Sequence, residues 1–275
     1  PMMQHYLKMK EENPESILFY RLGDFYEMFF EDAKLVSQEL DLVLTGRSAG
    51  VEEKVPMCGI PFHAANSYIQ RLVKKGYKVA ICEQLEDPSS AKGLVDRGII
   101  KIITPGTYMD ATMDAKSTNY MASCDVSSFE ITVIYCELST GELKYQTLQR
   151  SLVALQKALL EQNVSELVCP MTMDKKWMAA LEEMDTMLIS KHKKANIDPE
   201  DLPLLNGIES ESLKEAFALL MAYLKDTQKQ RIDHFLPIES MDKDKVLVMD
   251  YETKNHLELV SSQSSNAKAE SLWSF

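Results

Sequence analysis

The sequence predicts an α/β protein with more than one domain, the first of them built on a mixed sheet. Three observations support this fold class. Apolar segments with the length of buried strands alternate with segments of helical periodicity. The 275 residues are enough for two hydrophobic cores. A polar stretch at 108–118 separates two series of such elements.

In the first series, the apolar segment at 17–22 predicts a buried strand. A helix is expected over 25–40, because apolar residues recur there at helical spacing. Further strands are expected at 55–60, 77–85 and 99–103, a polar loop at 45–54, and a helix at 64–75 that ends before Gly76.

The second series begins with β-forming residues at 128–138, which a Thr140-Gly141 turn connects to a returning segment at 143–148. This pattern predicts a β-hairpin. Beyond it we expect helices at 152–160, 175–184 and 213–224, and a short strand at 166–170.

Composition limits the possible functions. The net charge of −12 argues against tight nucleic-acid binding by the chain as a whole, although the segment 71–101 has seven basic and four acidic residues. No apolar run is long enough to span a bilayer, so no membrane partner is expected. The five cysteines are scattered without a CxxC pair, which favours reduced thiols and a cytoplasmic location.

Several kinds of chemistry have no motif in this sequence. It contains no phosphate loop, no serine-hydrolase motif and no zinc-deaminase motif. The five histidines show no metal-ligand spacing. We therefore expect no catalytic residue, metal or cofactor in this chain.

The segment Gly23-Asp24-Phe25-Tyr26-Glu27 joins the first predicted strand to the first predicted helix. One interpretation is structural: Asp24 and Glu27 form a capping box, and Phe25 packs in the core. The other is functional: the Phe25 ring wedges between bases while the Glu27 carboxyl contacts a base edge. Tyr26 is expected to pack. These five residues alone leave both interpretations open.

Other segments decide between them. They are 55–64 (Val-Pro-Met-Cys-Gly-Ile-Pro-Phe-His-Ala), 79–84, Asp87-Pro88 with 92–95, and Thr104-Pro105-Gly106-Thr107. With the Gly-Asp-Phe-Tyr-Glu motif, and in this order, they resemble the N-terminal part of the MutS family of DNA mismatch sensors. The sequence departs from the family pattern at Cys58 and Phe62, where Ala and Tyr are frequent, and at Leu22, where Met or Val is usual.

The resemblance implies a mismatch-recognition domain at 1–114, in which Phe25 is the wedge and Glu27 the base contact. It also implies a connector domain with a ribonuclease-H-like fold at 115–243 and the start of a helical core or lever domain at 244–275. The implied partners are mismatched double-stranded DNA, a MutL-type protein and, in a full-length homodimer, a second subunit. ATP and magnesium are implied for an ATPase site beyond residue 275.

The implied mechanism tests how easily DNA deforms. A mismatched step kinks more cheaply than a paired one, so an inserted ring distinguishes the two. A protonated Glu27 can donate to a purine N7, and an ionised Glu27 can accept from a thymine N3–H. The candidates for contact with DNA phosphates are Arg47, Lys74, Lys75 and Lys78.

Two alternative functions remain. The chain could be a protein-interaction module. A ribonuclease-H-like domain could also cut nucleic acid with two metal ions held by Asp125, Glu130, Glu137 and Glu142. Strand alternation places only some of these carboxylates on one face, which disfavours the nuclease.

Overall fold

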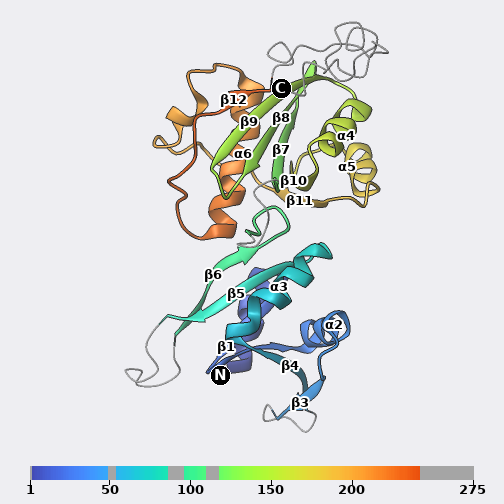
Figure 1. The fold of residues 1–275 in the computed structure, drawn as a ribbon, viewed down its shortest axis with the longest axis vertical. Coiled ribbons are helices and arrows are strands. Elements are labelled where there is room, and N and C mark those ends of the chain that lie inside the picture. The colour runs from blue at the N-terminus through green and yellow to red at the C-terminus, as the bar shows by residue number, and fades with distance from the viewer. Residues whose placement is uncertain (1, 49–53, 86–95, 110–117, 242–275) are drawn as a thin grey trace, which may run out of the picture. The chain divides into compact units, whose positions relative to one another are not determined.

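The computed structural model describes residues 2–48, 54–85, 96–109 and 118–241 (Figure 1). One compact unit, Pro1–Glu239, contains all of the described residues except Ser240 and Met241. The helical region expected at 244–275 and the family segment at 92–95 lie outside the described residues. Two mixed sheets confirm the predicted α/β class.

The first sheet has the order β3-β4-β2-β1-β5-β6. Its strands are β1 (Ser16–Leu22), β2 (Phe25–Phe29), β3 (Thr45–Arg47), β4 (Val55–Pro61), β5 (Lys78–Gln84) and β6 (Arg97–Ile103). The β1–β5 pair is parallel and the other pairs are antiparallel. The strands expected at 17–22, 55–60, 77–85 and 99–103 are confirmed to within two residues.

Both faces of this sheet are covered. Helices α2 (Phe30–Leu40) and α3 (Ala65–Lys74) contribute to the core on one face, and α1 (Met2–Glu12) packs on the other. A one-turn 3-10 helix, η1 (Phe62–Ala64), precedes α3. The sequence did not predict α1, which carries only one fully buried side chain, Tyr6.

The helix expected over 25–40 is wrong in its first five residues, which form strand β2. Tyr26 and Met28 are buried and alternate with Phe25 and Glu27, a period of two that the helical interpretation overlooked. Gly23 has a φ of 57°, which permits a tight turn between β1 and β2. Asp24 therefore lies in a hairpin turn and caps no helix, so the capping-box interpretation is excluded.

The second sheet has the order β11-β10-β7-β8-β9-β12. Its strands are β7 (Tyr120–Val126), β8 (Glu130–Glu137), β9 (Glu142–Gln149), β10 (Val164–Pro170), β11 (Leu188–His192) and β12 (Glu239–Ser240). The strands β7, β8 and β9 form an antiparallel meander, while β10 is parallel to both β7 and β11. The predicted hairpin is confirmed, but β7 and β11 were not predicted.

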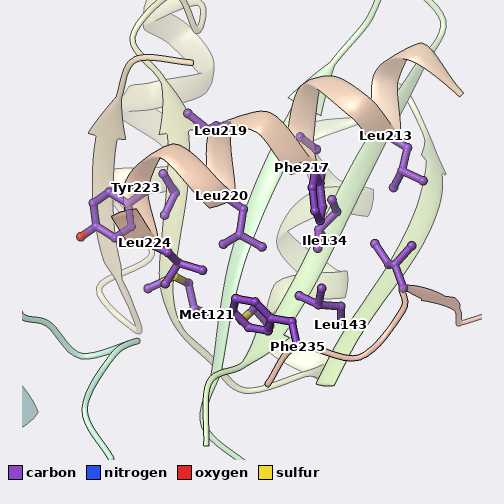
Figure 2. Packing of buried hydrophobic residues seen from close by; sticks show 14 of the residues in the cluster. Met121, Ile134, Leu143, Leu213, Phe217, Leu219, Leu220, Tyr223, Leu224 and Phe235 are labelled. Atoms are coloured by element: carbon purple, nitrogen blue, oxygen red, sulfur yellow. The ribbon is translucent and has the colours of Figure 1, made fainter. Parts of the chain in front are cut away.

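Helices cover both faces of the second sheet as well. The long helix α6 (Glu211–Gln228) lies across one face, and its Phe217 and Leu220 point toward Ile134 and Met121 (Figure 2). Helices α4 (Leu152–Glu161) and α5 (Lys175–Glu182) lie on the other side of the sheet (Figure 1). A short 3-10 helix, η2 (Leu202–Leu205), precedes α6.

A fully buried carboxylate, Glu166, lies beneath α6. Its strand is bulged at Ser165, so Val164 pairs with Tyr120 while Glu166 pairs with the next residue, Met121. Consecutive strand residues face opposite ways, so the bulge turns Glu166 toward the α6 side, where Met121 packs.

Four uncharged donors surround this carboxylate. The hydroxyl of Thr104 donates to it over 2.5 Å, the Gly106 N–H over 3.0 Å and the Ser190 hydroxyl over 2.6 Å. The Tyr223 hydroxyl also donates to it. Burial, together with the neighbouring Glu166 charge, raises the pKa of Tyr223 well above its ordinary value, so Tyr223 remains a donor. Glu166 thereby connects the Thr104–Thr107 turn to the sheet and α6.

The five cysteines are free and buried. Burial raises the pKa of the Cys58 thiol to about 11 and that of Cys82 to about 12. Because the thiolate is the nucleophilic form, these two side chains are unreactive at neutral pH. No helix in the described part of the chain is long and apolar enough to cross a membrane.

We expect Glu166→Ala to lower the free energy of unfolding by about 3 kcal/mol or more, because four buried donors lose their acceptor. Glu166→Gln should cost less, since its amide oxygen still accepts hydrogen bonds. Urea denaturation of this chain measures both changes. The exposed Glu161→Ala serves as control and should change stability by no more than about 0.5 kcal/mol. Equal values for Glu166→Ala and Glu161→Ala would show that the buried network contributes nothing.

Candidate nucleic-acid interface

The β1–β2 hairpin exposes one aromatic residue and buries the next. Phe25 is 47% exposed, whereas Tyr26 is 7% exposed and packs against Phe19 with ring centroids 5.8 Å apart. Phe25 and Glu27 point to the same side of the sheet as Phe29, which contacts Tyr6 of α1. Tyr6 covers Phe29, and the Phe25 ring at the turn remains open to solvent.

Glu27 and Arg47 form an ion pair on this side of the sheet. Strand β4 lies between them, with Gly59 opposite Glu27 and Val55 opposite Arg47. The Glu27 side chain is 17% exposed and that of Arg47 40% exposed.

The structure places Phe25 and Glu27 on the same side of β2 and pairs Glu27 with Arg47. The backbone of Arg47 lies opposite Val55, six residues along β4 from Pro61, the partner of Phe25. The aromatic ring supplies a stacking surface, the carboxylate an acceptor, and the guanidinium a positive charge suited to a phosphate. Groups of these kinds contact bases and phosphates in other nucleic-acid interfaces.

The predicted lysines lie elsewhere. Lys78 pairs with Ser16 at the start of β1, whereas Phe25 pairs with Leu22 at its end. Six residues of strand separate these positions by about 20 Å. Lys74 ends α3, just before Lys75. Lys78 lies 3.4 Å from Glu15, and Lys75 pairs with Glu39 at 2.5 Å. Phosphate contact by these lysines stays a prediction, and the structure does not group them with Phe25.

Two residues at the turn were missed by sequence reasoning. The Arg21 guanidinium carbon lies 3.8 Å from the ring centroid of Phe62, and Phe62 is 41% exposed. The available signal was Arg21 itself, the one charged residue in the apolar segment at 17–22.

Three of the four carboxylates of the nuclease alternative have separate partners. Asp125 contacts Lys194 at 3.1 Å and accepts from Ser212 at 2.9 Å. Glu142 accepts from the Tyr120 hydroxyl at 2.6 Å. In the residues that the structure describes, no group of three or more His, Cys, Asp and Glu side chains is arranged to hold a metal ion.

Glu137, another of these carboxylates, caps the β8–β9 turn. It accepts from the Ser139 hydroxyl at 2.5 Å and from the Thr140 N–H at 2.8 Å. Burial acts to raise the pKa of Glu137, but these hydrogen bonds outweigh it and hold the pKa below its ordinary value. Glu137 therefore has a structural role in the hairpin.

The first sheet lies in a region that is similar to known proteins. Residues 1–112, which contain the whole first sheet, match the family model described as MutS domain I. The chain carries a MutS domain I. The resemblance to MutS proteins, drawn from the Gly-Asp-Phe-Tyr-Glu motif and the segments after it, is thereby confirmed.

The similarity to MutS proteins continues past this domain. The chain is 42% identical over 278 residues to the DNA mismatch repair protein MutS of Bacillus licheniformis, covering 99% of this chain and 31% of that protein. It is 40% identical to the MutS proteins of Bacillus subtilis and Clostridium tetani, with 99% of this chain and 32% of each relative covered. The chain thus spans about a third of the length of the relatives it matches.

Replacing Phe25 by Ala should lower the free energy of unfolding of this chain by only about 1 kcal/mol, because half of the ring is already in water. The matched control is Phe29→Ala in the same strand, where the side chain is fully buried and the expected loss is about 3–5 kcal/mol. Urea denaturation of both variants measures the difference. A loss at Phe25 as large as that at Phe29 would mean that Phe25 is a core residue.

Proposed function

We propose that this chain binds mismatched double-stranded DNA as the N-terminal part of a DNA mismatch repair sensor. The observation that carries the proposal is an exposed Phe25 presented at a hairpin turn, with Glu27 on the same side of the sheet. Its membership of the MutS family supports the choice of ligand, because the relatives named above are DNA mismatch repair proteins.

In the proposed mechanism Phe25 inserts between bases and stacks on one of them. Inserting a minor-groove wedge costs a few kcal/mol of unstacking per step, which ring stacking partly offsets. A mismatched step has lost pairing and stacking, so its remaining cost is smaller. Discrimination then follows from the deformability of the step, and one ring can test many kinds of mismatch.

Glu27 is proposed to contact a base edge, and its pairing with Arg47 supports the acceptor mode. The Arg47 guanidinium places a positive charge beside the Glu27 carboxylate, and a carboxylate accepts from a thymine N3–H or an equivalent donor. Arg47 would lie near the backbone of the same base step, where its charge offsets that of Glu27. The alternative mode is donation from a protonated Glu27 to a purine N7.

The proposal assigns residues 1–114 to mismatch recognition, 115–243 to a ribonuclease-H-like connector and 244–275 to the start of a helical core. The strand order of the second sheet, an antiparallel meander followed by two parallel strands, supports the connector assignment. We propose no catalytic role for this chain. In a full-length cytoplasmic protein we propose a homodimer that binds a MutL-type partner and uses ATP and magnesium at a site outside this chain.

We predict that Phe25→Ala lowers the preference of the full-length protein for heteroduplex over homoduplex DNA by at least about fivefold to tenfold. The reason is that alanine cannot stack, and base stacking of this kind contributes roughly 1–3 kcal/mol. Fluorescence anisotropy with a 30-base-pair duplex, with and without a single G·T mismatch, measures the ratio of the two dissociation constants.

Glu27→Gln removes the charge while leaving a side chain of the same size. We expect it to lower heteroduplex affinity and to leave the Phe25-dependent stacking in place. Unchanged discrimination by both Phe25→Ala and Glu27→Gln would reject the wedge and favour the protein-interaction module.

This chain alone should bind homoduplex DNA no more tightly than roughly micromolar at physiological salt. Its net charge is −12, and non-specific affinity depends on neutralising phosphates. The same anisotropy titration at two salt concentrations measures the affinity and its salt slope. Nanomolar binding would contradict the expectation that this chain alone binds homoduplex DNA weakly.

A further inference from the structure

We infer that Arg21 is a positioning residue that fixes the wedge from the back of the β1–β2 turn. Arg21 pairs with Tyr26 and faces the α2–α3 side, whereas Phe25 and Glu27 face the opposite side. The inference rests on the proposed function, because it concerns how Phe25 is held for insertion. It adds a residue that acts on DNA recognition through Phe25.

Arg21 and Phe62 together fix both carbonyl groups of the turn. The Arg21 Nε donates to the Gly23 carbonyl oxygen at 2.5 Å. The backbone N–H of Phe62 donates to the Asp24 carbonyl oxygen at 2.9 Å. Gly23 and Asp24 are the only residues between the paired positions Leu22 and Phe25, so these two hydrogen bonds hold the turn from which Phe25 projects.

The Arg21 guanidinium is itself held on several sides. Its carbon lies 3.8 Å from the centroid of the Phe62 ring, and its Nη1 lies 3.5 Å from a carboxylate oxygen of Glu83. Glu83 also accepts from the Tyr26 hydroxyl. Burial, with the neighbouring Glu83, raises the pKa of Tyr26 above its ordinary range, so Tyr26 stays a donor. The stack and the ion pair leave Arg21 one preferred position.

A direct phosphate contact is a poorer explanation for Arg21. Its side chain is only 17% exposed and is already paired with Glu83, whose side chain is 24% exposed. The Arg21 backbone carbonyl also accepts from Arg97 Nε at 3.0 Å, which fixes the end of β1. Arg47, on the Phe25 side and 40% exposed, is better placed to reach a phosphate.

A β1–β2 turn that is ordered before DNA binds favours recognition, because inserting the Phe25 ring between bases costs free energy. A ring that must be ordered as it binds loses conformational freedom at that moment, and a pre-ordered ring does not. The planar guanidinium is needed to stack on Phe62 while it donates to Gly23. A lysine can donate and pair with Glu83, but it cannot stack in the same way.

The test measures the ratio of homoduplex to heteroduplex dissociation constants for the full-length protein and its Arg21→Ala, Arg21→Lys and Phe62→Leu variants. We expect Arg21→Ala to lower the ratio by about twofold to tenfold, the range for one newly mobile side chain, with homoduplex affinity unchanged. Arg21→Lys should keep part of the discrimination that Arg21→Ala loses. Phe62→Leu should lower the ratio by less than Arg21→Ala does. Arg71→Ala, at an exposed arginine of α3, controls for loss of charge.

A double-mutant cycle with Phe25→Ala identifies the route of the effect. If Arg21 acts through Phe25, Arg21→Ala causes no further loss of discrimination in the Phe25→Ala background. Thermal melting of each variant shows that it is folded, and Phe62→Leu provides the same test if Arg21→Ala does not fold.

Three outcomes would overturn the inference. Equal losses of homoduplex and heteroduplex affinity, with a salt slope reduced by about one, would make Arg21 a phosphate contact. An additive loss in the Phe25→Ala background would show a separate role, and wild-type discrimination in folded Arg21→Ala and Phe62→Leu would show no role. If Phe25→Ala itself keeps full discrimination, the proposed function fails instead.

Discussion

The register of the β1–β2 hairpin is the constraint on which the candidate interface depends. Leu22 and Phe25 close a turn of two residues, so Tyr26 falls on the α2–α3 side of the sheet and Phe25 on the α1 side, where its ring is exposed. A shift by one residue would exchange these side chains, because strand residues alternate between faces. The Tyr26 ring packed against Phe19 and the positive φ of Gly23 both oppose such a shift.

Buried carboxylates anchor elements around both sheets. In the first, Asp32 accepts from Lys10 of α1 at 2.8 Å and from the Leu18 N–H at 2.9 Å, so α1 is tied to β1 and α2. In the second, Glu166 ties the Thr104–Thr107 turn to α6 through uncharged donors alone. Each carboxylate is buried at the cost of its hydration, which only a complete set of donors offsets. Two of the acidic residues, Asp32 and Glu166, therefore stabilise the interior of the protein.

The fold class and most strands could be predicted from the sequence, because an apolar run of the length of 77–85 indicates a buried strand. The prediction was wrong at 25–29. The helical spacing of apolar residues after residue 29 was taken to begin at Phe25, although 25–29 form an aromatic strand. The prediction also missed β7, a buried strand interrupted by Ser123 and Cys124, and α1, whose apolar face is narrow. Phe25 and Glu27 were proposed as contact residues from the motif, and their role stays a prediction. The Arg47 contact with Glu27 and the Arg21 contact with Gly23 depend on pairing across strands, which one sequence does not display.

The buried thiols make this protein suited to site-directed labelling. All five cysteines are enclosed, and burial raises the pKa of Cys58 and Cys82 to about 11 and 12. A maleimide dye requires an accessible thiolate, so it should modify a cysteine introduced on the surface and spare these native ones. The exposed position Asp41, in the left-handed turn after α2, offers such an attachment point without removal of any native cysteine. A dye there, paired with a second label on a bound ligand, would report the distance between the two labels in solution.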